Sequence, residues 1–157
     1  SSLLVALTNA RPAVGAYPFT TLEPTIGMLR EPPIADIPGL IEGASTGKGL
    51  GIDFLRHIEK TKMLLHCIDL TDPTPKKSYE TVRDEFGAFN AELLTKPEII
   101  LLTKADLVRL SRIRKTRALF AKSGKKILTC SIYDPTSITR LKKAIMDART
   151  TFQVKQL

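Results

Sequence analysis

Residues that mark several common protein classes are scarce in this sequence. Among its 157 residues there are two cysteines, two histidines and no tryptophan. Cys67 and Cys130 lack the paired spacing of a metal site, and we expect both to be reduced core residues of an intracellular protein. His57 and His66 are interpreted as structural residues. No apolar run approaches the roughly 18 residues that span a bilayer, and the first residues do not resemble a signal peptide, so no membrane span is expected.

Acidic residues are also in deficit, because 24 Lys and Arg stand against 16 Asp and Glu and give a formal net charge of +8. This excess favours a polyanionic partner such as RNA, and a solvated basic helix face without a partner is the alternative. No aromatic residues interleave with the late charges, so base stacking is not indicated. These late basic residues are Arg109, Arg112, Arg114, Lys115, Arg117, Lys122, Lys125, Lys126, Arg140, Lys142 and Lys143.

Hydrophobic residues make up 43% of the chain, which suits one globular domain with strands and helices in alternation. An irregular loop is expected over 11–23. Such alternation predicts an α/β fold, with a mostly parallel sheet flanked by helices on both faces and ligands at the carboxyl ends of the strands. The periodicity predicts helices over 1–8, 52–61, 76–95, 109–122 and 137–148, and strands over 25–30, 33–36, 63–70, 98–103 and 127–131.

The stretch Asp36-Ile-Pro-Gly-Leu-Ile-Glu-Gly-Ala-Ser45 follows the strand predicted over 33–36. A carboxylate at a strand end can reach a magnesium ion through water, and a glycine amide shortly after it can approach a terminal phosphate. The alternative interpretation is a strand that ends in an ordinary Pro-Gly turn. A dinucleotide-binding loop is disfavoured, because Gly47, Gly49 and Gly51 do not have the required spacing.

Lys104 and Asp106 follow the buried strand predicted over 98–103. A carboxylate here can accept hydrogen bonds from the N1 and N2 donors of guanine, while the lysine stem covers a face of the base. Adenine lacks both donors, so Asp106 would select guanine. A solvated loop is the alternative, and the order of the motifs along the chain argues against it: Thr20-Thr21, then Asp36 with Gly39, then Lys104-x-Asp106, then Cys130-Ser-Ile132.

Together these segments resemble the Obg family of GTPases. The residues that carry the resemblance are Ser1-Ser-Leu-Leu, Tyr17-Pro-Phe-Thr-Thr-Leu22 with Pro24, Asp36 to Ser45, Gly49-Leu-Gly51, Phe54-Leu-Arg-His-Ile-Glu59, and Leu64-Leu-His66 with Ile68-Asp69. The resemblance implies the Ras-like G-domain version of the P-loop NTPase fold. It implies that residues 1–157 are a G domain without its first strand and phosphate loop, and without the family's glycine-rich amino-terminal domain.

The resemblance also implies roles at the phosphates. Ser1, Thr21 and Asp36 would bind Mg²⁺, and Thr21 and Gly39 would contact the γ-phosphate as catalytic residues, with Thr20 beside them at the nucleotide. Leu40 stands where Ras-like GTPases carry the glutamine that positions the attacking water, so intrinsic hydrolysis of GTP should be slow.

At the base, the resemblance assigns Thr103, Lys104, Asp106, Ser131 and Ile132 to guanine, with the amides around Ser131 and Ile132 supporting the base oxygen. Two features depart from the family. Thr103 replaces the usual Asn, which removes an amide that ties this loop to the phosphate loop, and Cys130-Ser-Ile132 is a degenerate form of the family's Ser-Ala pair.

The implied function is a switch that alternates between GTP and GDP and acts in maturation of the large ribosomal subunit. Its partners would be that subunit, its rRNA and other assembly factors, and no DNA is expected. The alternative is an inactive G domain that serves as an rRNA-binding scaffold, as Thr103 and Leu40 would allow. The basic charge and the drift of the motifs favour a mitochondrial matrix protein, with the bacterial cytoplasm as the alternative.

Overall fold

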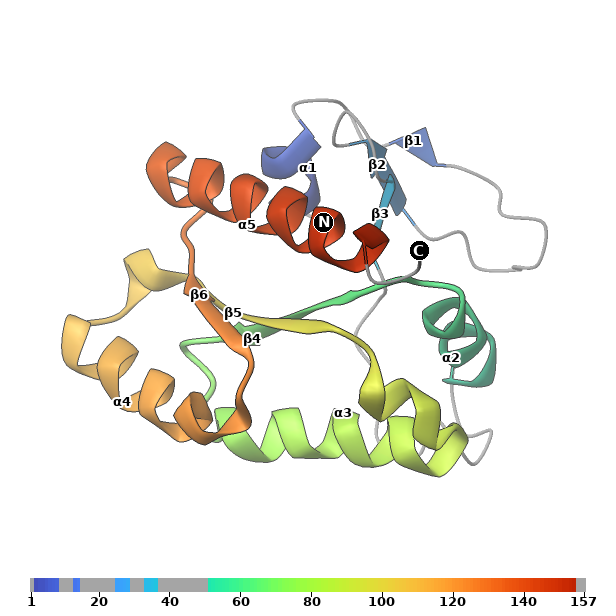
Figure 1. Cartoon of the computed structure of the whole chain (residues 1–157). Coiled ribbons are helices and arrows are strands. Elements are labelled where there is room, and N and C mark those ends of the chain that lie inside the picture. Colours follow the sequence, from blue (N-terminus) through green and yellow to red (C-terminus); the bar gives the residue numbers. More distant parts are fainter. Residues whose placement is uncertain (1, 9–12, 15–24, 29–32, 37–50, 155–157) are drawn as a thin grey trace. The chain divides into compact units, whose positions relative to one another are not determined.

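The computed structural model describes residues 2–8, 13–14, 25–28, 33–36 and 51–154 (Figure 1). The chain divides into two compact units. One contains Ser1–Asp36 and Cys130–Leu157, and the other contains Ile37–Thr129. Each unit is described by itself.

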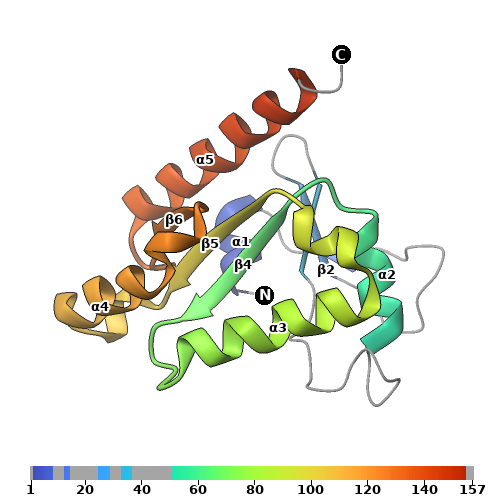
Figure 2. The same ribbon diagram turned by 60° about the horizontal axis from the view of Figure 1, so that its bottom comes forward.

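The unit of Ile37–Thr129 is built on a parallel sheet of three strands in the order β4-β5-β6 (Figure 2). The strands are β4 (Leu64–Asp69), β5 (Glu98–Thr103) and β6 (Lys126–Thr129). Leu64 is aligned with Glu98 and Asp69 with Thr103, so β4 and β5 end at the same edge of the sheet. The parallel sheet confirms the predicted α/β class and brings the loops after β4 and β5 together.

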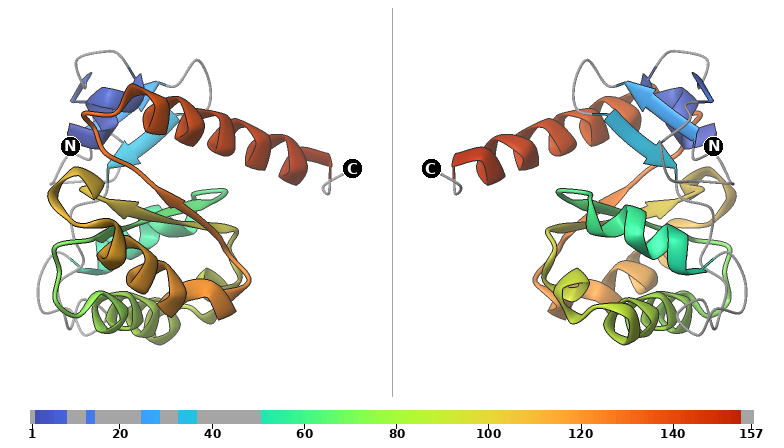
Figure 3. Two further views of the ribbon diagram at one scale, coloured as in Figure 1. Left: turned by 90° about the vertical axis from the view of Figure 1, so that its left-hand side faces the viewer. Right: turned by 90° about the vertical axis from the view of Figure 1, so that its right-hand side faces the viewer.

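Helices α3 (Pro75–Phe89) and α4 (Leu110–Phe120) connect these strands and lie on the same face of the sheet (Figure 3). This placement follows from the topology, because two successive crossovers of the same hand between neighbouring parallel strands put both helices on one side. The core between helices and sheet contains Ile68, Leu70, Ile100, Leu102 and Phe120. A second cluster joins α2 (Gly51–Glu59) to α3 and contains Leu55, Ile58, Leu64, Phe86 and Leu93.

The helix predicted over 76–95 is interrupted at Asn90. The backbone of Asn90 is extended, and its side-chain oxygen accepts a hydrogen bond from the amide of Glu92 at 2.9 Å. Asn90 therefore caps a separate 3₁₀ helix, η2 (Ala91–Thr95). The prediction of one helix was wrong here because a short polar side chain competes with the backbone for hydrogen bonds and starts a new turn.

Strand β4 is only partly buried. Leu64 and Ile68 are buried, Cys67 is exposed, and the other three residues are intermediate. The prediction that Cys67 belongs to the core was wrong, whereas Cys130 is buried as predicted. In the described sheet β4 is a terminal strand, and an apolar sequence run does not distinguish such a strand from a central one. Strand β5, at the centre, is buried from Glu98 through Leu102.

The other unit contains a small antiparallel sheet in the order β1-β2-β3. Its strands are β1 (Ala13–Val14), β2 (Thr25–Met28) and β3 (Pro33–Asp36). Strand β1 pairs with β2, although residues 11–23 were predicted to be irregular throughout. Two residues are too short to give a periodic pattern, so only the pairing reveals this strand. Antiparallel pairing aligns Asp36, the last residue of β3, with Thr25.

Helices α1 (Ser2–Thr8) and α5 (Pro135–Val154) complete this unit, and α5 extends beyond the predicted range of 137–148. Strand β6 ends at Thr129, earlier than predicted, and the amide of Ser131 donates to Ser137 Oγ at 3.1 Å instead of continuing the hydrogen-bond ladder of the sheet.

In the parallel-sheet unit, two short 3₁₀ turns, η3 (Ala105–Leu107) and η4 (Ala121–Ser123), flank α4. No helix within the described ranges combines the length and apolar character needed to cross a membrane.

Candidate functional site

Lys104 begins the loop that leaves the carboxyl end of β5. Its backbone is left-handed, with φ 58° and ψ 40°, a conformation that is uncommon for a residue with a side chain. The carbonyl oxygen of Lys104 accepts a hydrogen bond from the amide of Leu107 at 3.1 Å, which closes the turn of η3. A left-handed lysine costs about 1 kcal/mol or more, and such residues are concentrated at functional sites.

Asp69, at the end of β4, holds the side chain of Lys104. Lys104 Nζ lies 2.6 Å from Asp69 Oδ2. Asp69 Oδ1 accepts hydrogen bonds from the amide of Thr71 at 2.8 Å and from its hydroxyl at 2.6 Å. Partial burial tends to raise the pKa of Asp69, but the hydrogen bonds from Lys104 and Thr71 outweigh it and hold this pKa below its usual value. The carboxylate is therefore ionised at neutral pH and fixes the lysine stem.

No role for Asp69 was predicted from the sequence. The signal that could have found it is its position, because Asp69 and Lys104 follow neighbouring strands of one parallel sheet and the register aligns Asp69 with Thr103. Parallel strands end at a common edge, so the two side chains were placed within reach of each other by topology.

Thr103 ties the end of β5 to β4. Its hydroxyl donates to the carbonyl oxygen of Ile68 at 3.2 Å, and its own carbonyl accepts from the amide of Leu70 at 3.2 Å. These two hydrogen bonds to the end of β4 fix the position at which the loop after β5 begins. Asp106 lies in η3, exposed, two residues after Lys104. The loop therefore presents a carboxylate next to a lysine whose backbone and ammonium are positioned by separate contacts.

Ser131 and Ile132 belong to the unit of Ser1–Asp36 and Cys130–Leu157. The amide of Ser131 donates to Ser137 Oγ, and the hydroxyl of Ser131 accepts from the amide of Tyr133 at 3.1 Å. Ser137 Oγ also contacts the carbonyl oxygens of Ser131 and Asp134 at 3.0 and 2.8 Å. Hydrogen bonds within the loop therefore hold its conformation, and the Ser131 amide, one of those predicted to support a base oxygen, is engaged by Ser137 Oγ.

Among the residues predicted at the phosphates, Asp36 is described. It ends β3, where its partly buried carboxylate supplies the hard oxygen ligands that suit Mg²⁺. Ser1, Thr20, Thr21, Gly39 and Leu40 lie outside the described residues. The described ranges contain no group of three or more His, Cys, Asp and Glu side chains that could hold a metal ion.

Comparisons with known proteins show which family this chain resembles. A family model described as "50S ribosome-binding GTPase" matches residues 1–104. The protein GTPase Obg of Pelagibacter ubique is 43% identical, in a match that covers 93% of this chain and 46% of that protein. GTPase Obg of Persephonella marina is 39% identical over 100% of this chain and 49% of its own length. The chain thus spans about half the length of the relatives it matches.

The fold has a solved counterpart. The translation elongation factor SelB of Methanococcus maripaludis, in complex with the GTP analogue GppNHp, superposes with a TM-score of 0.61. The match covers 95% of this chain and 30% of SelB, at 18% sequence identity. At that identity the likeness concerns the fold alone, and it supports the P-loop GTPase architecture.

Proposed function

The chain belongs to the Obg family of 50S ribosome-binding GTPases, and from this premise we propose that it binds guanine nucleotides and hydrolyses GTP as a molecular switch. The observation that carries the proposal is the loop after β5. Its lysine is held in a left-handed conformation with Nζ 2.6 Å from Asp69, and a carboxylate follows two residues later. A strained backbone and an ion pair both fix the position of this lysine, and we infer that the lysine has a specific task.

The task we propose is recognition of the base. Asp106 accepts hydrogen bonds from N1 and N2 of guanine, and the aliphatic stem of Lys104 packs on the ring. Adenine offers no matching donors, so ATP would leave the Asp106 carboxylate without partners and would bind poorly. Thr103 and Asp69 position the loop.

Phosphate chemistry would take place at the residues that the family resemblance names. Asp36, through water, together with Ser1 and Thr21 would hold Mg²⁺, and the ion would supply positive charge that stabilises negative charge on the phosphates. The amide of Gly39 and the Thr21 residue would contact the γ-phosphate. Leu40 cannot orient the attacking water, so hydrolysis would be slow until a partner or a cation assists. A slow switch suits a protein whose nucleotide state is read by a large assembly.

We further propose that this assembly is the large ribosomal subunit during its maturation, with rRNA and other assembly factors as the contacts. The description of the matching family and the net charge of +8 support this proposal. The alternative is an inactive G domain that serves as a scaffold on rRNA. Two observations favour it: Thr103 stands in place of the usual Asn, and Leu40 in place of a glutamine.

Titration of fluorescently labelled GDP into the full-length polypeptide with magnesium tests the proposal. We expect saturable binding that unlabelled GTP displaces and ATP does not. Release of inorganic phosphate from GTP, followed over hours, then separates a slow enzyme from a scaffold. Failure to bind at tens of micromolar would refute the switch, and binding without phosphate release in the presence of large ribosomal subunits would favour the scaffold.

A further inference from the structure

The positive charge of this protein is concentrated in one stretch. No acidic residue occurs between Asp106 and Asp134, and every charged side chain in that interval is a lysine or arginine. The interval contains α4, η4 and β6 of the parallel-sheet unit. The cations are Arg109, Arg112, Arg114, Lys115, Arg117, Lys122, Lys125 and Lys126, and their summed charge equals the formal net charge of +8.

The structure separates these cations into two groups. Arg112 and Lys125 are turned inward and bonded. Arg112 donates from Nε to the carbonyl of Leu70 at 3.2 Å and from Nη2 to that of Asp72, and Lys125 pairs with the buried carboxylate of Glu98. The remaining six are exposed. We call five of these the α4 basic surface: Arg109, Arg114, Lys115, Arg117 and Lys122.

No carboxylate among the described residues pairs with the α4 basic surface. Helix α3, on the same face of the sheet, differs: it contains both signs of charge, and its Lys76 lies 3.5 Å from Glu80 one turn away. Mixed signs are what a solvated helix face ordinarily carries. An unneutralised helix face repels itself, and a bound polyanion relieves that repulsion.

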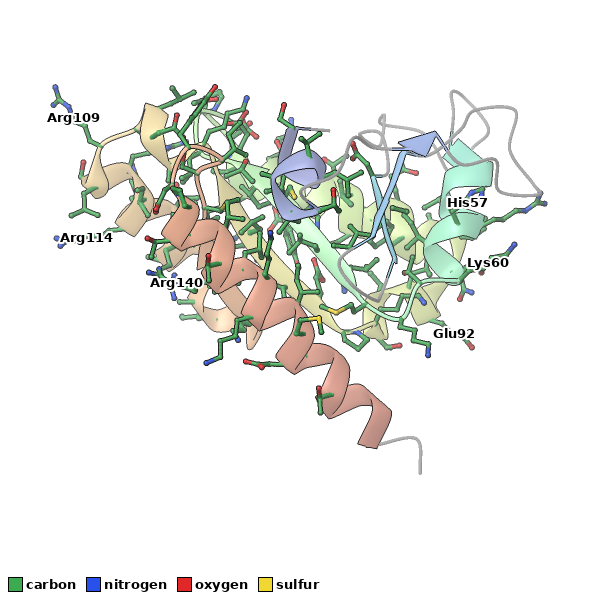
Figure 4. The ribbon with its side chains drawn as sticks, turned by 90° about the horizontal axis from the view of Figure 1, so that it is seen from above. His57, Lys60, Glu92, Arg109, Arg114 and Arg140 are labelled. Atoms are coloured by element: carbon green, nitrogen blue, oxygen red, sulfur yellow. The ribbon has the colours of Figure 1, made fainter. Side chains whose placement is uncertain are left out.

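The geometry of the surface suits phosphates. Arg114 and Arg117 are three residues apart, so their Cβ atoms are neighbours on the helix at about 5–6 Å. Arg109 precedes the helix, and Figure 4 shows Arg109 and Arg114 extending away from the ribbon. Arginine binds phosphate through two parallel hydrogen bonds, which favours it over lysine at such contacts. No aromatic side chain on this surface is exposed for base stacking, because Phe120 is 3% exposed.

The helix that carries the surface is held firmly. Arg112 attaches α4 to the two backbone carbonyls that follow β4, and Ile113 and Phe120 pack on the core. The surface also begins three residues after Asp106, so it directly follows the loop after β5 that is proposed to recognise the base, here called the base-reading loop. A polyanion bound there would meet cations at fixed positions instead of on a mobile tail.

We propose that the α4 basic surface binds the phosphate backbone of RNA, without reading its sequence. The identity of that RNA as part of the large ribosomal subunit rests on the proposed function, whereas the contact itself rests on the charges and exposure of α4. The exposed Leu110 and Leu119 make an acidic protein the competing partner, and the test must separate the two.

The test uses the full-length polypeptide and a fluorescein-labelled RNA hairpin, with anisotropy measured across a series of KCl concentrations. The variant R109Q/R114Q/R117Q should bind the hairpin at least about tenfold more weakly at low salt. Its plot of log affinity against log salt should be shallower by roughly two to three, about one for each phosphate that the variant no longer neutralises. The charge-conserving variant R109K/R114K/R117K should stay within a fewfold of the unmodified protein.

The matched control removes three exposed lysines outside this surface, K62Q/K76Q/K77Q, and should leave the slope of the salt dependence nearly unchanged. If the slope of log affinity against log salt falls equally in both triple variants, the proposal is overturned. RNA binding would then depend on the total charge of the protein and not on the α4 basic surface. Polyglutamate that binds as tightly as RNA, and whose binding disappears in the same arginine variant, would assign the surface to an acidic protein and overturn it as well.

Labelled GDP separates this proposal from the proposed function. All variants should bind GDP with unchanged affinity, since none of the substituted residues belongs to the proposed base-reading loop. If the unmodified protein binds RNA as expected but no GDP, the switch fails and the RNA surface stands. If it binds GDP while the arginine variant retains full RNA affinity, the RNA surface fails and the switch stands.

Discussion

Lys104 Nζ and Asp69 Oδ2 lie 2.6 Å apart, across the ends of two parallel strands. The carboxylate also accepts hydrogen bonds from the amide and the hydroxyl of Thr71. Moving the carboxylate out into solvent would break these two hydrogen bonds. The pair is partly exposed, with 54% of the lysine side chain and 35% of the aspartate side chain accessible. An ion pair this exposed contributes little to the free energy of unfolding, so we expect its main effect to be on the orientation of the lysine stem.

Replacing Asp69 with asparagine should therefore weaken nucleotide binding moderately. D69N retains the shape of the side chain but removes the charge that holds Lys104, and exposed ion pairs contribute at most about 1 kcal/mol, or roughly fivefold in affinity. Labelled GDP titration should show that decrease with the preference for GTP over ATP intact. D84N, an exposed carboxamide substitution on α3, serves as the control and should bind as the unmodified protein. Equal affinities for D69N and D84N would contradict the positioning role.

Asp106 should determine which base is bound. In D106N one acceptor oxygen becomes an amide donor, so guanine meets a donor opposite its own donors. We expect GDP affinity to fall by about 100-fold or more, since sites built around a polar group reject a mismatched partner strongly. Xanthosine diphosphate carries a carbonyl oxygen where guanine carries the amino group, and it should bind D106N better than GDP does. Competition titrations with both nucleotides measure the change.

A variant that stops binding GDP without binding xanthosine diphosphate would need a separate check of folding by circular dichroism. If D106N is folded and both nucleotides bind with equal weakness, Asp106 does not read the base edge. If GDP affinity is unaltered, the proposed role of Asp106 is refuted.

Sequence periodicity predicted the parallel sheet and placed Lys104 and Asp106 at a strand end. This succeeded because β5 is a central strand, and its continuous apolar run from Ile99 to Leu102 matches a buried position. The strand ending at Asp36 was predicted from the short apolar stretch of Pro33, Ile34 and Ala35. Elements defined by their own apolar pattern can be predicted from the sequence alone.

What could not be predicted depends on contacts between distant residues. The exposure of Cys67 follows from the terminal place of β4 in the described sheet, which only strand pairing reveals. The partnership of Asp69 with Lys104 requires the register of two strands. The engagement of the Ser131 amide by Ser137 depends on the exact start of α5, and element boundaries are the least determined feature of a sequence pattern.

Glu98 forms a buried charge cluster that should make stability depend on pH. Its side chain, 0% exposed, contacts His66 Nδ1 at 3.0 Å, Arg83 Nη1 at 2.9 Å and Lys125 Nζ. Burial tends to raise the pKa of Glu98, but the hydrogen bonds from His66 and Lys125 outweigh it and hold this pKa below its usual value of 4.5. The ionised form is therefore favoured by folding, and its contribution is complete above about pH 4.5.

As the pH falls through the lowered folded-state pKa, the carboxylate takes up a proton and this contribution disappears. E98Q should destabilise the protein by about 3 kcal/mol at pH 7, because it leaves Arg83 and Lys125 without a buried counter-charge. Urea unfolding at pH 7 and at acid pH measures both proteins. The gap between them should narrow as the pH falls below about 4.5, and a gap that stays constant would show that the charge of Glu98 is not what stabilises the cluster.

Two arginines of one helix should behave oppositely, which tests the division of the basic residues into bonded and exposed groups. Arg112 donates to the backbone carbonyls of Leu70 and Asp72, whereas Arg114 is exposed two positions further on. R112M removes both hydrogen bonds and leaves two partly buried carbonyls without a donor, which costs about 1–3 kcal/mol of unfolding free energy. R114M should change it by about 0.5 kcal/mol or less, as surface substitutions do.

Methionine keeps the apolar stem in both variants, so the comparison isolates the guanidinium. Urea unfolding gives the two free energies, and anisotropy with the RNA hairpin gives the second readout. R112M should be less stable while its RNA affinity under native conditions falls little, and R114M should bind RNA more weakly while its stability is unaltered. Equal decreases of stability in both variants would mean that the exposed arginines support the fold, and the case for a dedicated phosphate-binding surface on α4 would then fail.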